Sequence, residues 1–473
     1  MIVPSQAVAK MQEGRDALVG GLIAAVSACV VTLFICEPSL LAKGLFVLLT
    51  LAALLRFDFF VYASVFLLPW CPLVDLNLPV RDVFLVFRLV LFVGIWIRLR
   101  SRGRSIHEWL FGSKLKKGMV LFAGIAIASV LLSGVPGNLP SYRSLALLVS
   151  YLAAFFAIDG WLENKAQLVR VLKLLLISTI GVALFGFYQE IEGGYTDLYF
   201  RLYPLQEEGL EPWTGRITSL LFHFNSLAGY LNLVIPFAIA CAVLAKDRAL
   251  KFLGLVCACA AAVAVVVTQS RGGLLALVGI LIIAVWLLAP RLIGRIKFLC
   301  GGLLACMLLL PPLLNHFERL QGIDEATQST RTFLWLAAAR LFLAHPFLGV
   351  GYGNYRFLYA DLVPAAVQGR LDAHDLYLQL LAETGLVGFV TFTALLWGFL
   401  HLSLKAIRDQ DPLSRIIAFG VFGAITATLI HGTVDFLLNV SPQFGALFWI
   451  VLGLGSRAMA GTTNKMISKR APS

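Results

Sequence analysis

Residues 273–289 read GLLALVGILIIAVWLLA, an apolar run without a charged side chain. A helix needs about 20 mostly apolar residues to cross a bilayer, so this run predicts a transmembrane helix. The whole chain has fourteen such runs, this one included, near 17–36, 39–55, 58–75, 83–99, 118–134, 143–160, 168–190, 219–245, 249–268, 273–289, 296–314, 385–404, 413–435 and 443–460. Because the shortest runs can merge or re-enter, the sequence predicts an all-α, polytopic bundle of about 12–14 transmembrane helices.

Composition agrees with this class. The chain has 59% hydrophobic and 14% charged residues, whereas a soluble domain has about 25% charged residues. The eight cysteines lie in or at the ends of apolar runs, which is typical of small hydrophobic side chains and not of a disulfide framework or a zinc site.

The basic residues orient the predicted bundle. If the N-terminus is cytoplasmic, 26 of the 38 Lys and Arg and 12 of the 13 lysines fall in inside segments. This bias predicts that both termini are cytoplasmic. The net charge of +12 is then explained by topology and anionic lipid, and it does not indicate nucleic-acid binding.

Two polar segments interrupt the apolar pattern on the predicted outer side. They divide the chain into N-terminal transmembrane helices (1–190), a first periplasmic segment (191–218), central transmembrane helices (219–314), a large periplasmic loop (315–384), and C-terminal transmembrane helices with a cytoplasmic tail (385–473).

The larger loop has three predicted parts. Residues 327–345 alternate arginines with large apolar side chains, which favours a helix lying along the membrane surface. Residues 346–355 contain three glycines and predict a turn, with a backbone nest for phosphate as an alternative. Residues 370–385 begin the returning helix and carry His374. An ionisable side chain at the membrane edge indicates a catalytic role more than a packing role.

Four short motifs occur in a fixed order along the chain. They are Arg216 with Asn225, the corner Ser270-Arg271-Gly272-Gly273, the turn His345-Pro346 with Gly349 and Gly351, and His374 followed by Tyr377-Leu378 and Gly385. Together they resemble the bacterial O-antigen ligase and O-antigen polymerase superfamily over about residues 216–388. The chain departs from that pattern at His223-Phe224-Asn225, where the ligases usually have His-Pro-Asn, and at Asp375, where asparagine is common.

The resemblance implies an integral membrane glycosyltransferase with its active site facing the periplasm in the bacterial inner membrane. Its donor would be a glycan linked to undecaprenyl diphosphate, its acceptor lipid A-core, and no cofactor would be needed. A polymerase that joins a second lipid-linked repeat unit is the alternative, and a transporter of lipid-linked oligosaccharide is a weaker one. Membrane lipids are the remaining partners.

The resemblance also implies roles for particular residues. His374 would be the catalytic base, and Arg216, Arg271 and Arg331 would bind the diphosphate, since guanidinium groups grip phosphate and stay charged. Candidates for supporting or acceptor-binding roles are Asp375, Tyr377, Asn225, His431 and Asp435.

Structural readings of the same residues remain open. His374 could be a helix-terminal residue that bonds a backbone carbonyl, and Asp375 could orient the imidazole or cap the helix. Arg271 could be an interfacial anchor, Arg331 part of a surface helix, and Arg216 could pair with Glu207, Glu208 or Glu211. His431 and Asp435, four residues apart, are expected to share one helical face and to bond each other.

Two rival classes are less favoured. A metal-dependent oligosaccharyltransferase would be expected to have Asp-x-Asp loops on the outer side, where this chain has none, so no metal site is predicted. A secondary transporter usually has two similar halves with polar breaks at mid-membrane. Here the halves do not obviously repeat.

Overall fold

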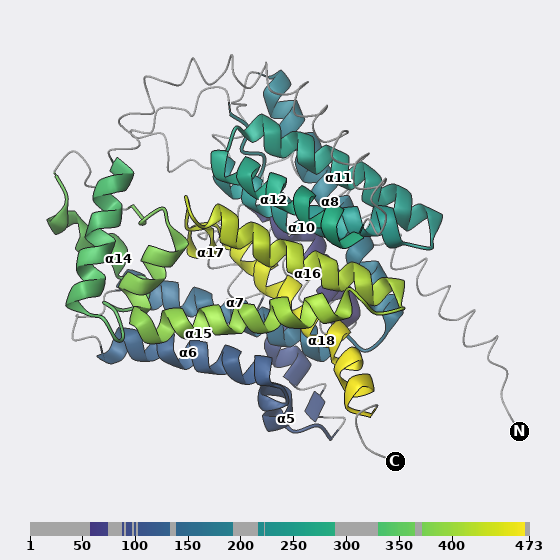
Figure 1. Cartoon of the computed structure of the whole chain (residues 1–473), viewed down its shortest axis with the longest axis horizontal. Coiled ribbons are helices and arrows are strands. Elements are labelled where there is room, and N and C mark those ends of the chain that lie inside the picture. Colours follow the sequence, from purple (N-terminus) through teal and green to yellow (C-terminus); the bar gives the residue numbers. More distant parts are fainter. Residues whose placement is uncertain are drawn as a thin grey trace, which may run out of the picture.

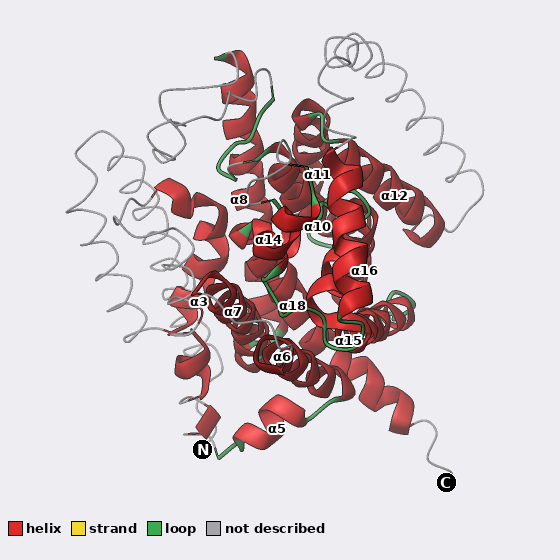
Figure 2. Cartoon of the chain, turned by 90° about the vertical axis from the view of Figure 1, so that its left-hand side faces the viewer, coloured by secondary structure: helices red, strands yellow, loops and turns green. Residues whose placement is uncertain are grey.

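The computed structural model describes residues 57–73, 88, 91–96, 99–100, 103–132, 139–192, 216–221, 223–288, 330–364 and 371–468. Across these ranges the chain is helical and has no strand (Figures 1 and 2). Eight helices within them are long and apolar enough to cross a membrane. The predicted all-α, polytopic membrane class is therefore confirmed. The expected spans at 17–36, 39–55 and 296–314 lie outside the described residues.

Apart from the start of α15, the eight helices start and end near the predicted apolar runs. They are α6 (Lys114–Leu132), α7 (Leu139–Trp161), α8 (Lys165–Ile191), α10 (Phe224–Leu244), α11 (Arg248–Thr268), α12 (Arg271–Leu288), α15 (Leu376–Ala406) and α16 (Pro412–His431). The other described elements with defined limits are α3 (Phe57–Leu67), η1 (Leu68–Leu73), α5 (Ile106–Phe111), α14 (Tyr355–Leu358), η3 (Tyr359–Leu362), α17 (Leu437–Val440) and α18 (Pro442–Ser468).

Helix α10 is the centre of the bundle. It packs against α11, α12 and α16. Of its most apolar 18-residue stretch, 83% is buried, compared with 33% of the corresponding stretches of α11 and α15. Small residues allow the close approach of α16, because a side chain at Gly420 or Gly423 would collide with Phe237 or Pro236 of α10. The outer faces of α11 and α15 expose large apolar side chains such as Phe252 and Trp397, as expected of surfaces that face lipid.

Helix α15 is broken near its start. It begins at Leu376, earlier than the expected span at 385–404, and Gly385 interrupts it with a φ of +61°. The glycine-containing turn at 346–355 packs against the break in α15. The N–H groups of Val350 and Gly351 donate to the carbonyls of Ala382 and Glu383. Since these N–H groups are already bonded, the glycines serve a close backbone contact, and the phosphate-nest alternative is wrong at these two positions.

Polar groups gather at the two ends of the bundle. The starts of α10, α12 and α15 meet the end of α16 at one end, on the left in Figure 1. At the other end, Lys165, the first residue of α8, bonds Asp411, which directly precedes α16, at 2.9 Å. Lys173 of α8 lies 3.4 Å from Asp247, which caps α11. The predicted site residues and these lysines are thus separated by the length of the helices.

Candidate active site

His374 occupies an unusual backbone position directly before α15. Its φ is +48°, a left-handed conformation that costs a non-glycine residue about 1–3 kcal/mol and persists only where neighbouring contacts hold it. The next residue, Asp375, caps the helix, because its Oδ1 accepts from the N–H groups of Tyr377 at 2.9 Å and Leu378 at 2.8 Å. Asp375 therefore shapes the helix start and is not the carboxylate that contacts the imidazole.

The partner of His374 is Asp435, which follows the end of α16. The Nδ1 atom of His374 lies 3.1 Å from Oδ1 of Asp435, and the two side chains are 31% and 5% exposed. Burial acts to lower the pKa of His374, but the hydrogen bond and the charge of Asp435 outweigh it, and the pKa is raised. Burial acts to raise the pKa of Asp435, yet the hydrogen bond and charge of His374 hold it well below its usual range. An ionised carboxylate that accepts from Nδ1 leaves Nε2 as the nitrogen that can take a proton.

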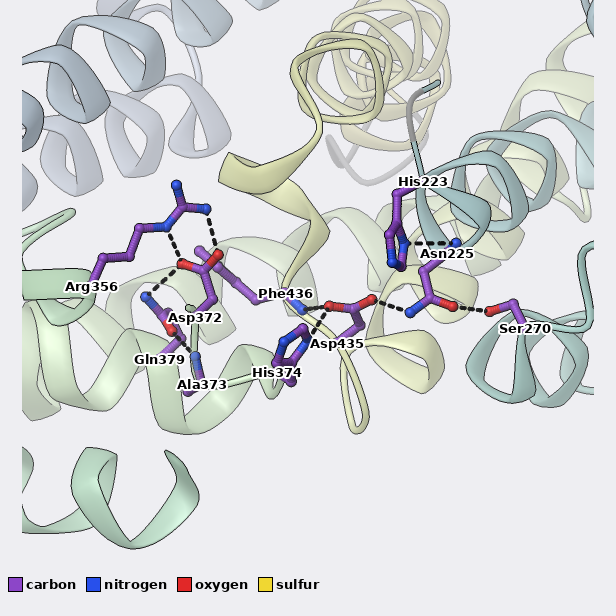
Figure 3. Close-up of polar contacts among 10 residues, drawn as sticks. All are labelled: His223, Asn225, Ser270, Arg356, Asp372, Ala373, His374, Gln379, Asp435 and Phe436. Atoms are coloured by element: carbon purple, nitrogen blue, oxygen red, sulfur yellow. Dashed lines mark hydrogen bonds and ion pairs between the residues drawn. The ribbon is translucent and has the colours of Figure 1, made fainter. Parts of the chain in front are cut away.

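A hydrogen-bonded chain continues from Asp435 into the central helices (Figure 3). Asn225, in the first turn of α10, donates from Nδ2 to Oδ2 of Asp435 at 2.7 Å. Its Oδ1 accepts from the Ser270 hydroxyl at 2.6 Å. Ser270 also accepts from the N–H of Gly273 at 3.2 Å and so caps α12. Four segments far apart in the sequence are joined here through buried polar groups.

His223 borders the same cluster. Its Nδ1 accepts from the N–H of Asn225 at 3.1 Å, which makes the imidazole the cap of α10. An acceptor nitrogen must be unprotonated. Burial lowers the pKa of His223 to about 4, against the opposing effect of Asp435, so the ring is neutral near pH 7.

His431 does not form the expected pair with Asp435. Helix α16 ends at His431 with Gly432 as its cap, so Asp435 lies beyond the helix and bonds His374 and Asn225. Both ring nitrogens of His431 are buried without a hydrogen-bond partner among the described residues. His431, Asp435 and apolar side chains of α15 and α17 line a small cavity with room for about one water molecule.

The three predicted phosphate-binding arginines lie around this cluster. Arg331 is half-buried in a helix whose described part covers 330–344, and its charge acts on His374 and His431. Arg216 stacks its guanidinium 4.4 Å from the ring centre of Phe224. Arg271 is exposed in the first turn of α12, directly after Ser270.

The loop that carries Arg216 is fastened to α8. Gln189 accepts from the N–H groups of Ser219 at 2.6 Å and Thr218 at 3.1 Å. The Ser219 hydroxyl donates to the carbonyl of Val182 at 2.8 Å. These buried bonds fix the position of the loop against the bundle.

Comparison with known proteins supports the family resemblance that the sequence motifs indicated. Residues 255–393 match the family model described as O-antigen ligase. The chain is 23% identical over 448 residues to the teichuronic acid biosynthesis protein TuaE of Bacillus subtilis (strain 168), with 88% of each chain covered. Over residues 255–393 the chain is therefore similar to the O-antigen ligase family, in agreement with the resemblance of its sequence motifs. It is a multi-pass membrane glycosyltransferase.

The O-antigen ligase match covers only part of the site. It includes the Ser270-Arg271 corner, Arg331, His374 and Gly385, and it leaves Arg216, Asn225 and Asp435 outside. The bonds from His374 to Asp435 and from Asn225 to Ser270 therefore connect the matched region with the helices on either side of it.

The structure brings most, but not all, of the predicted side chains together. His374, Asp435, Asn225 and His431 lie around one buried centre. Tyr377 is turned away from it, because its hydroxyl donates to the carbonyl of Leu429 in α16 at 2.8 Å. That bond joins α15 to α16 and gives Tyr377 a packing role.

Sequence reasoning missed several members of the cluster. Ser270 was recognised in a motif but not as a bonding partner, and a cap signal was available, since serine directly precedes α12. His223 was noted only for its departure from the family pattern. Arg356, Asp372 and Gln379, which bond one another beside His374, had no local signal because their contacts join separate elements.

Proposed function

We propose that this glycosyltransferase moves a glycan from undecaprenyl diphosphate to a hydroxyl group of lipid A-core, at the periplasmic face of the bacterial inner membrane. The observation that carries the proposal is the partly exposed His374 ring, held at Nδ1 by the buried carboxylate of Asp435. A histidine with one nitrogen fixed by a carboxylate and the other free for a proton suits a general base.

In the proposed reaction, Nε2 of His374 removes the proton of the acceptor hydroxyl. The acceptor oxygen attacks the anomeric carbon while the bond from that carbon to the diphosphate breaks, so that the diphosphate leaves on its lipid. One displacement of this kind inverts the anomeric configuration. A well-positioned base contributes about 100 to 10,000-fold to such a step.

Negative charge grows on the leaving diphosphate, and we assign Arg216, Arg271 and Arg331 to it. Guanidinium groups bind phosphate oxygens in a two-pronged manner and cannot be neutralised. One fixed donor aimed at developing charge contributes about 3 kcal/mol. These side chains would supply the charge stabilisation without a metal ion or a cofactor.

The surrounding polar residues would support the base. Asp435 would keep His374 in one tautomer and stabilise the imidazolium formed during transfer, as carboxylate partners of histidine do. Asn225 would hold Asp435 through its 2.7 Å bond. His431 would support Asp435 from the small cavity that both side chains line.

A polymerase is the second candidate function. The relative from Bacillus subtilis is named for teichuronic acid biosynthesis, which favours an acceptor other than lipid A-core. In a polymerase the base, the arginines and the leaving group would be the same, and the acceptor would be a second lipid-linked repeat unit. Transport of a lipid-linked oligosaccharide is a weaker third candidate.

One experiment separates these candidates. The purified protein in nanodiscs would receive undecaprenyl-diphosphate oligosaccharide as donor, first with lipid A-core and then without it. Glycan on lipid A-core, unaffected by EDTA and lost in His374→Ala, is the expected result. Lengthening of the donor alone would make the protein a polymerase. Transfer that survives in His374→Ala would remove His374 as the base, and no transfer in either arm would favour the transporter.

A further inference from the structure

A second buried polar cluster lies against the segment that holds His374 (Figure 3). It consists of Arg356 on α14, Asp372 in the segment before α15, and Gln379 and Glu383 in the first turns of α15. Asp372, Gln379 and Glu383 are 6%, 0% and 1% exposed. The proposed reaction gives none of these four residues a role.

The amide of Gln379 is the centre of this cluster. Its Oε1 accepts from the backbone N–H of Ala373 at 2.7 Å. Its Nε2 donates to Oε1 of Glu383 at 2.8 Å and to Oδ1 of Asp372 at 3.4 Å. An amide has one accepting end and one donating end. With a backbone N–H on one side and two carboxylates on the other, only one orientation of the amide satisfies all three groups.

Arg356 closes the cluster from the other side. Its Nε donates to Oδ1 of Asp372 at 2.6 Å, and its terminal nitrogen pairs with Oδ2. The two side chains are 20% and 7% exposed. This two-pronged pair ties the segment before α15 to α14 and places a positive charge beside two buried carboxyl groups.

These bonds bear directly on the strained backbone of His374. Ala373, the preceding residue, is held by Gln379. On the other side, Asp375 caps α15, and the N–H of Leu376 donates to the carbonyl of Gly432 at 2.7 Å. The left-handed conformation of His374 is therefore bracketed by hydrogen bonds. Such bracketing is what allows an unfavourable φ to persist.

We propose that Gln379 is the positioning residue of the active site: its amide, held between the carboxylates of Asp372 and Glu383, fixes the backbone at Ala373 and thereby aims the His374 ring at Asp435. The inference rests on the proposed role of His374 as the base. Gln379 touches neither substrate nor the reacting atoms, so its loss should impair catalysis while leaving donor binding largely intact.

The test uses Gln379→Glu, which keeps the shape of the side chain. The new carboxylate can still accept from Ala373, but its other oxygen faces Asp372 and Glu383 without a hydrogen to donate. At a pH at which the added carboxyl is ionised we expect kcat to fall about ten-fold or more, with KM for the lipid-linked donor changed less than about two-fold. Protonation of the added carboxyl restores a donor, so the ratio of variant kcat to wild-type kcat should rise as the pH is lowered.

Two further variants make the test specific. Gln379→Glu combined with Glu383→Gln reverses the bond between the two side chains and keeps the number of buried carboxylates, so kcat should return to within about three-fold of wild type. The matched control is Gln167→Glu, a buried glutamine in the capping box of α8 at the opposite end of the bundle. Its kcat, and its ratio to wild type across the pH range, should be unchanged.

The outcomes separate this inference from the proposed function. An unchanged kcat and pH profile in Gln379→Glu, or a loss that the double variant fails to rescue, would overturn the positioning role. If His374→Ala is inactive while Gln379→Glu behaves as wild type, the base assignment stands and only this inference falls. If His374→Ala retains transfer, the proposed function falls first.

Discussion

His374 differs from ordinary surface histidines in its backbone as well as in its side chain. The described residues include three non-glycine residues with positive φ, namely Ser219, Gln269 and His374. All three stand in the segments that carry Arg216, Ser270 and the proposed base. Strained backbone at these points indicates that the positions of these side chains are held by their surroundings.

The bond between Asp435 and His374 leads to a prediction about pH dependence. The base must be unprotonated, so activity should rise with pH through the pKa of His374, which Asp435 raises above its ordinary value of 6.5. In Asp435→Asn that pKa should fall, and the rising limb of the kcat profile should move to lower pH. The maximal rate should also drop about 100-fold, because the imidazolium loses its counter-charge.

The control for this prediction is Asp411→Asn. Asp411 caps α16 at the opposite end of the bundle, and asparagine is an equally good cap. Its pH profile for transfer should match that of the wild type. An unshifted limb in Asp435→Asn would show that Asp435 does not act on the base.

The partner of His374 could not be predicted from spacing. The i, i+4 rule joins His431 to Asp435 only while the helix continues, and α16 ends at His431. The actual bond connects residues 61 positions apart on different elements. Composition and motif order located His374 and the arginines, whereas the links through Asn225 and Ser270 depend on helix packing that no local pattern encodes.

The length of an apolar run predicted the limits of several helices well. The run at 273–289 corresponds to α12, Arg271–Leu288, and the run at 249–268 to α11, Arg248–Thr268. The apolar run at 385–404 did not mark the start of α15, because its first turns carry Gln379 and Glu383; the prediction that residues 370–385 begin the returning helix, with Asp375 as a possible cap, agrees with the start at Leu376. The side chains of Gln379 and Glu383 are buried against protein, so the helix can begin before the apolar run.

The break in α15 leads to the second prediction. In Gly385→Ala, the new Cβ would lie 2.3 Å from the backbone carbon and oxygen of Phe347, and alanine disfavours the φ of +61°. We expect a loss of at least about 2 kcal/mol in unfolding free energy. Transfer activity should fall as well, since the same turns of α15 hold the segment of His374.

Gly124→Ala is the matched control. Gly124 lies inside α6, where an added Cβ would meet no atom of the described residues within 4 Å, and alanine is the better helix former. Thermal unfolding of the purified protein in one detergent should show equal or slightly higher stability than wild type. A Gly385→Ala variant as stable as Gly124→Ala would contradict the role of the break.

Two kinds of ion pair within the bundle should differ sharply in their effect on its stability. Asp159 is 4% exposed, pairs with Lys116, and accepts from the Ser456 hydroxyl at 2.8 Å. Lys165 and Asp411 form an exposed pair, with side chains 72% and 29% accessible. The first pair joins α6, α7 and α18 within the bundle, whereas the second lies at its surface.

The third prediction compares these pairs by thermal unfolding. Asp159→Asn should lower the unfolding free energy by about 3 kcal/mol, because it leaves the ammonium group of Lys116 without its counter-charge. Lys165→Met should change it by less than about 1 kcal/mol. Similar effects of the two substitutions would mean that the Asp159 cluster is not buried in the folded protein.

The fourth prediction concerns orientation. Leu343, 74% exposed in the helix that carries Arg331, and Gln410, exposed at the other end, should lie on opposite sides of the membrane. A membrane-impermeant maleimide applied to whole cells with a permeable outer membrane should label Leu343→Cys and not Gln410→Cys, relative to the unchanged chain. The reverse pattern would place the site in the cytoplasm and rule out the proposed acceptor.

The turn that fills the break in α15 limits how such proteins can be recombined. Pro346 and Phe347 accept from the N–H groups of Leu386 and Val387, while Val350 and Gly351 donate to Ala382 and Glu383. Main-chain atoms alone form this seam, so it depends on geometry more than on side-chain identity. A chimera that inherits residues 346–351 from one parent and 376–390 from another must reproduce both backbones together. Exchange of the two stretches as one block is therefore the design that preserves a working enzyme.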